Sequence, residues 1–154
     1  MDPKDIANPI IDDDSVNVLL EALPYIREFH GKTVVIKYGG AAMREESLRQ
    51  AFADDVVLLK YVGLNPVIIH GGGPEITKYM NKMGIEVRFQ HGLRVSDAET
   101  VEIAKMVLLG KLNADLVARL GRAGSPAVGL SGEDGGLFDV APVANAEEVG
   151  FVGD

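Results

Sequence analysis

A lysine and two glycine-rich turns are the residues of this sequence best suited to bind an anion. Lys37 directly precedes Tyr38-Gly39-Gly40, and Gly71-Gly72-Gly73 forms the second turn. Glycine lets the backbone approach an anion closely, and a helix that follows such a turn presents the positive end of its dipole. The pattern therefore predicts a site for phosphate or carboxylate, with Lys37 as the first candidate for catalysis.

Other chemistries receive less support from the residues. The second turn lacks the Gly-Lys-Ser/Thr ending of a Walker loop, and neither turn has the spaced glycines of a dinucleotide fingerprint. A purely structural role for the turns stays open, because glycine often only satisfies turn geometry. Arg94 could clamp a carboxylate through paired hydrogen bonds, or it could be a solvated surface arginine. The histidines lack metal-ligand spacing, so no metal site is predicted.

Two strand-turn-helix units are expected to position these groups. The apolar, β-branched runs Thr33–Lys37 and Pro66–Ile69 are typical of buried parallel strands, and helices are expected over 46–62 and 75–83. This order predicts an α/β fold, namely an open three-layer αβα sandwich with a mainly parallel sheet. Ligands of such folds bind at the C-terminal ends of the strands, where both glycine turns fall.

The remaining elements follow from turn signals and periodicity. They are a hairpin over 85–95, helices over 97–109 and 112–120 separated by Gly110, a third core strand over 127–130 and a short edge strand over 139–143. Ser96 and Glu99 have the spacing of a capping box for the first of these helices. Glu46 is interpreted as a solvated charge in the first turn of its helix. The hairpin, which carries Arg94, is expected to overhang the site.

Three ranges describe the organisation of the chain. Residues 1–14 combine prolines with an acidic run and predict a flexible tail. Apolar residues recur at helical spacing over 15–30, with Pro24 expected to kink the helix. Residues 31–154 hold the glycine turns and form the predicted domain. The hydrophobic pair Phe151-Val152 near the last residue indicates that structure continues there, so we interpret the sequence as truncated.

Composition limits the classes of function. The net charge of -8 and the pI near 4.8 argue against a broad basic face for nucleic acid or anionic lipid. No apolar run approaches the roughly 20 residues that span a bilayer, and no signal peptide is recognised. The absence of cysteine excludes a disulfide framework from these residues. These observations favour a cytoplasmic protein with neither a nucleic-acid nor a membrane partner.

Five motifs together resemble the N-acetylglutamate kinases of the amino-acid kinase family. In order along the chain they are residues 37–40, 70–74, 92–97, 110–113 and 129–135. The resemblance covers the chain from about Ser15 onward. It implies ATP-dependent phosphorylation of the side-chain carboxylate of N-acetyl-L-glutamate, which gives an acyl phosphate in arginine biosynthesis.

The resemblance also assigns roles to individual residues, position by position. Lys37 would stabilise the transferring phosphoryl group, Gly39 and Gly40 would contact the nucleotide cofactor, Gly40, Gly72 and Gly73 would bind substrate through backbone N–H groups, and Arg94 would clamp the α-carboxylate. The implied co-substrate is ATP with Mg²⁺. Such roles are coherent, because phosphoryl transfer depends on positioning and charge neutralisation.

The resemblance further implies what the chain lacks. Family members are about twice this long, and their ATP-binding half follows the region seen here. We therefore expect the 154 residues alone to bind acetylglutamate weakly without turning over ATP. Two alternatives stay open: a related carboxylate kinase that acts on a carrier-linked aminoadipate or glutamate, and a non-catalytic truncated domain for binding or assembly.

The helix over 15–30 resembles the N-terminal extension of arginine-inhibited family members, which interlaces dimers into a hexameric ring. The resemblance thus implies a homo-oligomer, either a dimer or a hexamer joined through this helix. A free amphipathic helix explains the same spacing of apolar residues without any partner.

Overall fold

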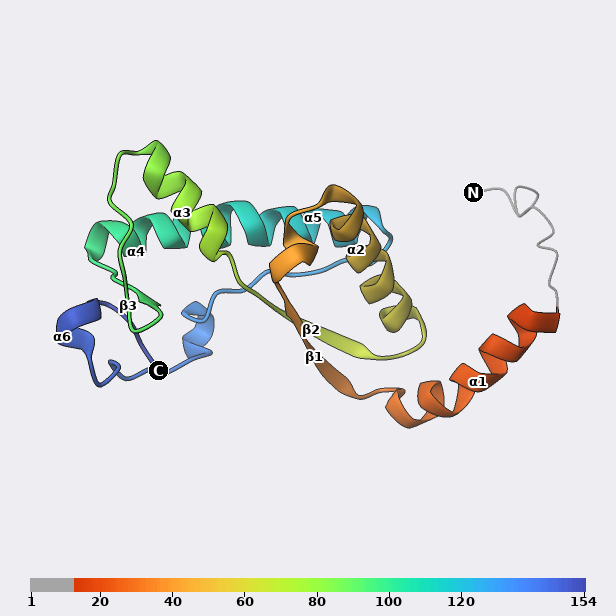
Figure 1. Ribbon diagram of the computed structural model, residues 1–154. Coiled ribbons are helices and arrows are strands. Elements are labelled where there is room, and N and C mark those ends of the chain that lie inside the picture. Colours follow the sequence, from red (N-terminus) through yellow and green to blue (C-terminus); the bar gives the residue numbers. More distant parts are fainter. Residues whose placement is uncertain (1–12) are drawn as a thin grey trace.

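The computed structural model describes residues 13–154 and consists of short strands among longer helices (Figure 1). The long elements are α1 (Asp13–Phe29), β1 (Thr33–Tyr38), α2 (Glu46–Tyr61), β2 (Asn65–His70), α3 (Gly73–Lys82), α4 (Ala98–Lys105), a π-helix (Met106–Asn113) and α5 (Ala114–Arg122). The short ones are a 3-10 helix (Gly40–Met43), β3 (Phe89–Gln90), β4 (Leu93–Arg94), a second 3-10 helix (Asp134–Gly136) and α6 (Ala146–Val149).

The two expected strand-turn-helix units are confirmed. β1 and β2 pair in parallel along their whole lengths, from Thr33 opposite Asn65 to Tyr38 opposite His70. Helices α2 and α3 follow the two strands, so the chain runs in the order β1-α2-β2-α3. The α/β class with a parallel sheet therefore holds, and both glycine turns lie at the same edge of the sheet.

Helices α2 and α5 pack on one face of this sheet. Tyr38 of β1 joins a buried cluster with α2 and α5, and Ile36 and Ile68 pack against it. On the opposite face, Val35 and Ile69 are 66% and 46% exposed. The sequence predicts fully buried strands, whereas residues 13–154 bury only alternate side chains of each strand.

A second core joins α3 to the long helical segment that follows the hairpin. Its buried side chains are Ile76, Met80, Ile103 and Val107. α4, the π-helix and α5 follow one another without a break, and Figure 1 shows them as one long helix. The predicted separation at Gly110 is therefore wrong. Packing of this segment outweighs the cost of a helical glycine, which is about 1 kcal/mol.

The predicted strand over 127–130 is also wrong. This segment has no strand pairing, and a cleft of about 460 Å³ separates it from β2. Gly129 lies against the side chain of Asn113, so the segment rests on the helical side of the cleft. Val128 is consequently 85% exposed. The edge strand predicted over 139–143 is reduced to one isolated bridge, between Pro142 and Gly153.

Local turn chemistry explains two further details. The turn of the β3–β4 hairpin is confirmed, since His91 and Gly92 both have the positive φ of a tight hairpin turn, 51° and 79°. The ladder itself is shorter than the predicted 85–95. The cap of α4 is Asp97, whose Oδ1 accepts from the Thr100 amide at 2.8 Å. Ser96 instead donates to the carbonyl of Arg94, so the predicted capping box is wrong by one residue.

The first described helix, α1, extends away from the other elements (Figure 1). It contains Pro24, and Asp13 and Asp14 already belong to it. The remainder of the predicted tail, residues 1–12, lies outside the described residues. Within residues 13–154, none of the helices has both the length and the apolar character needed to cross a membrane.

Candidate functional site

The two glycine turns are joined where the parallel strands end. The amide of Gly71 donates to the carbonyl of Tyr38 at 3.2 Å, which ties the second turn to the end of β1. His70 Nδ1 lies 3.0 Å from the carbonyl oxygen of Gly71, so this ring contacts the turn as well. Lys37 lies one residue before this junction. Its side chain is exposed, and it makes no hydrogen bond or ion pair with any of residues 13–154.

The first turn is held through its carbonyl groups. Gly40 has a φ of 63°, a left-handed conformation that favours glycine, and it begins the 3-10 helix. The Tyr38 hydroxyl donates to the carbonyl of Ala42 at 3.1 Å, and Arg49 Nε donates to the carbonyl of Met43 at 2.7 Å. These bonds fix the end of the turn, while a side chain at Gly39 or Gly40 would meet open space.

The second turn packs tightly against the π-helix. A Cβ added to Gly72 would lie 2.5 Å from Leu112 Cδ1 and 2.6 Å from Leu108 Cδ2. Packing against the π-helix therefore explains the absence of a side chain at Gly72. This agrees with the purely structural role that the sequence leaves open for the turn. Gly73 begins α3 and has open space around a Cβ.

Arg94 lies against α3 and is not a freely solvated arginine. Its Nη2 donates to the carbonyl of Gly73 at 3.1 Å and to Thr77 Oγ1 at 2.8 Å. Its Nη1 lies 3.4 Å from Met80 Sδ, and its guanidinium stacks 4.8 Å from the ring centroid of Phe89. Burial lowers the pKa of Arg94, although an arginine remains charged at neutral pH. The structure therefore connects Arg94 directly to the second turn.

Two groups of predicted site residues are thus formed. Lys37 lies in β1, and Gly39 and Gly40 directly follow this strand. The bond from Gly71 to Tyr38 links them to the second turn. Arg94 reaches Gly73 from the hairpin. The second turn is therefore bonded to the end of β1 through Gly71 and to Arg94 through Gly73.

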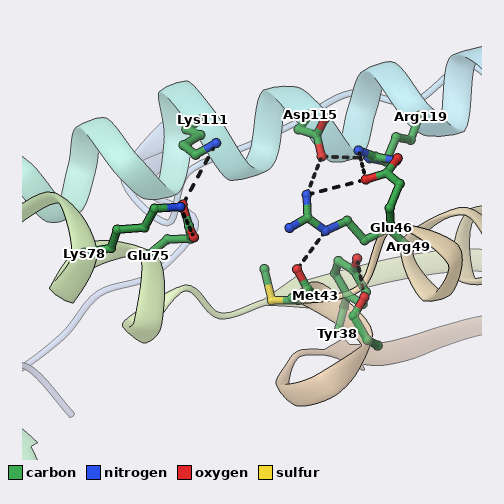
Figure 2. A network of polar contacts seen from close by, with 10 residues as sticks. Tyr38, Met43, Glu46, Arg49, Glu75, Lys78, Lys111, Asp115 and Arg119 are labelled. Carbon is green, nitrogen blue, oxygen red and sulfur yellow. Dashed lines mark hydrogen bonds and ion pairs between the residues drawn. The ribbon is translucent and has the colours of Figure 1, made fainter.

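A cluster of charged residues behind the first turn was missed by the sequence reasoning (Figure 2). Arg119 donates from Nη2 to Glu46 Oε2 at 3.0 Å and from Nε to Asp115 Oδ2 at 2.7 Å. Arg119 lowers the pKa of Glu46, and the two carboxylates raise that of Arg119. Arg49 lies 3.9 Å from Asp115. Two local spacings hint at this cluster, i, i+3 for Glu46 and Arg49 and i, i+4 for Asp115 and Arg119. Neither spacing shows that the two pairs meet, because they are distant in sequence.

The described residues offer no evident metal centre. Residues 13–154 contain no group of three or more His, Asp or Glu side chains placed to hold a metal ion. The arrangement instead offers backbone amides, an unpaired lysine and an oriented arginine to an anionic ligand.

The sequence profile of the amino acid kinase family matches residues 32–151. The chain belongs to the amino acid kinase family. Its resemblance to acetylglutamate kinases is likewise confirmed. That of Pelotomaculum thermopropionicum is 54% identical over 147 residues, covering 89% of this chain and 50% of the relative. The chloroplastic acetylglutamate kinase of Arabidopsis thaliana is 51% identical, covering 92% of this chain and 41% of the relative.

A solved structure shares the amino acid kinase fold. It is an N-acetylglutamate synthase from Neisseria gonorrhoeae complexed with coenzyme A and N-acetyl-glutamate, with a TM-score of 0.72 and 26% identity. The match covers 90% of this chain and 31% of the synthase chain. The chain spans about half the length of the curated kinases it matches. The sequence and the fold thus agree on the amino acid kinase family.

Proposed function

We propose that this chain is the acetylglutamate-binding part of an ATP-dependent acetylglutamate kinase. The reaction transfers the terminal phosphoryl group of ATP to the side-chain carboxylate of N-acetyl-L-glutamate, in the arginine biosynthetic pathway. The observation that carries the proposal is the hydrogen bond from Arg94 to Gly73, in a turn that is tied to the end of β1 one residue after the unpaired Lys37. Identity of about 50% to acetylglutamate kinases supports this choice of substrate.

The proposed roles follow from the chemistry of each group. A guanidinium suits a carboxylate, because paired hydrogen bonds fix orientation as well as charge, so Arg94 clamps the α-carboxylate. The amides of Gly72 and Gly73 orient the rest of the substrate at the positive end of α3. Lys37 neutralises charge that develops on the transferring phosphoryl group, and the amides of Gly39 and Gly40 contact the same group.

ATP is the proposed phosphoryl donor, with Mg²⁺ carried on its phosphates. The described residues lack a cluster of carboxylates that would hold a metal ion, so we assign no Mg²⁺ ligand to this chain. Magnesium usually binds through substrate phosphates and a few carboxylates, with several waters retained. The contribution of residues 13–154 is therefore to bind and orient the acceptor and to stabilise the phosphoryl group.

Taken by themselves, the 154 residues are proposed to bind acetylglutamate without turning over ATP. They span about half of each related kinase, and one unpaired lysine at the sheet edge offers limited charge for a triphosphate. Isothermal titration with N-acetyl-L-glutamate should give saturable heat, with unacetylated L-glutamate as the control. A coupled assay for ADP should remain at background. Absent heat would refute substrate binding, and sustained ADP release would refute the proposed inactivity.

The parent protein is further proposed to be a cytoplasmic homo-oligomer. α1 exposes a row of apolar side chains, including Leu19 and Leu20, which are 67% and 59% exposed. Such a row is covered when helices of two subunits interlace, as proposed for a dimer or hexamer. Deletion of residues 1–30 should lower the number of subunits per particle, as calculated from the mass measured by light scattering. An unchanged number of subunits would show that α1 does not hold the assembly together.

A further inference from the structure

Arg49 connects the charged cluster to the first glycine turn. Its Nε donates to the carbonyl of Met43, the last residue of the 3-10 helix, at 2.7 Å. Its Nη1 lies 3.9 Å from Asp115 and 4.0 Å from Glu46 (Figure 2). Because a guanidinium is planar, carboxylates near its outer nitrogen restrict the direction in which Nε points. That direction is toward the turn.

Arg119 in turn holds the two carboxylates. Its side chain is only 10% exposed, and it bonds to Glu46 from α2 and to Asp115 from its own helix. An ion pair with a largely exposed partner is a weak source of stability, because solvent screens the attraction. What such a cluster does provide here is fixed geometry, since it locks the first turn of α2 to α5 immediately after the glycine turn.

The opposite side of the turn is fixed as well. The Tyr38 hydroxyl donates to the carbonyl of Ala42, and the Tyr38 ring stacks on Phe52 with centroids 4.1 Å apart. Consecutive carbonyls at the end of the turn are thus bonded to side chains of different elements. Two side-chain hydrogen bonds therefore fix the last residues of the 3-10 helix that begins at Gly40, and Arg49 donates one of them.

We propose that Arg49 is a positioning residue for the phosphoryl-binding turn 39–43, and that Glu46, Asp115 and Arg119 orient it. The identity of the bound group rests on the proposed function. The positioning itself rests on the bond to Met43 and the charged cluster. Arg49 does not touch the reacting atoms; it keeps the Gly40 region in the conformation that the bound phosphoryl group requires.

The test compares variants of the whole 154-residue chain. Arg49→Met removes the bond and the charge, and Arg49→Lys keeps the charge alone. Arg44→Met removes an exposed charge directly after the turn and serves as the control. Amide hydrogen exchange of residues 39–45 should accelerate about tenfold in Arg49→Met, as expected for loss of one charge-assisted hydrogen bond. It should be intermediate in Arg49→Lys and unchanged in Arg44→Met.

A second readout separates positioning from general stability. Exchange in α4 and the π-helix should stay within about twofold of the wild type in all variants, because loss of one local bond opens only its own region. Inorganic phosphate should protect the turn amides of the wild type more than those of Arg49→Met. The inference is overturned if the turn amides of Arg49→Met exchange as slowly as those of the wild type. It is also overturned if exchange accelerates equally along the whole chain.

The outcomes also distinguish this inference from the proposed function. If acetylglutamate binds the wild type while Arg49→Met leaves the turn unchanged, the positioning role is rejected and the function stands. If Arg49→Met loosens the turn but acetylglutamate gives no heat, Arg49 keeps its positioning role and the proposed substrate is rejected.

Discussion

Replacement of Gly72 by alanine tests the packing of the second turn against the π-helix. The new Cβ would lie 2.5 Å from Leu112 Cδ1 and 2.6 Å from Leu108 Cδ2, whereas ordinary contacts are 3.4–4 Å. Both contacts are with the ends of flexible side chains, so part of the overlap is relieved by rotation. We therefore expect the lower part of the range for overpacking, about 1–2 kcal/mol of destabilisation.

The neighbouring glycine provides a matched control. Gly73 begins α3, and a Cβ there meets nothing within 4 Å. Alanine is a better helix former than glycine, so Gly73→Ala should leave the free energy of unfolding unchanged or raise it by up to about 1 kcal/mol.

Urea denaturation measures both variants, and thermal melting should place Gly72→Ala about 2–8 °C below the wild type. Equal stability of the two variants would refute the reasoning, because the close approach of Leu108 and Leu112 would then carry no cost.

Three further predictions concern charged residues. Asp97→Ala should lower the free energy of unfolding in urea by about 1 kcal/mol, since it removes the α4 cap, and Asp97→Asn should restore most of it. Arg119 lowers the pKa of Glu46, so their pair stabilises the fold above the ordinary glutamate pKa and loses this effect as the pH falls. The difference in urea midpoint between wild type and Glu46→Gln should therefore shrink from about pH 6 to pH 3. Arg94→Lys should weaken acetylglutamate binding in calorimetry by about tenfold or more, because lysine lacks the planar fork of donors.

Local signals predicted the parts of the fold that position the site. The β-branched run of β1 and the apolar run of β2 each lead into glycines and then a helix, and all these signals lie within a few neighbouring residues. The His91-Gly92 turn follows from the same local chemistry. Their order along the chain was enough to place Lys37 and both glycine turns at one edge of a parallel sheet.

The wrong predictions depend on residues that are distant in sequence. Gly110 looked like a helix boundary, but packing against α3 keeps the segment helical through it. The run 127–130 has the composition of a strand, yet it rests against Asn113 instead of pairing with β2. Strand identity requires a hydrogen-bonded neighbour, which composition alone does not provide.

Contacts between residues that are distant in sequence also determine the surroundings of Arg94 and Glu46. Arg94 could be either a carboxylate clamp or a surface arginine from sequence alone. Its bonds to Gly73 and Thr77 show that it is not freely solvated, and its role as a clamp stays a proposal. Glu46 stays largely exposed, as expected for a first-turn charge, but it also binds Arg119 from a helix 73 residues away. No periodicity in a single sequence connects positions that far apart.

We propose one site for an anionic amino-acid derivative, formed by Lys37, the two glycine turns and Arg94. An NMR titration of the ¹⁵N-labelled chain with N-acetyl-L-glutamate tests it most directly. We expect saturable shifts of the amides of Gly40, Gly72 and Gly73 and of Arg94 Nε, all with one dissociation constant. Shifts confined to other surfaces, such as the cleft beside β2, or an unchanged spectrum at saturating ligand would contradict it.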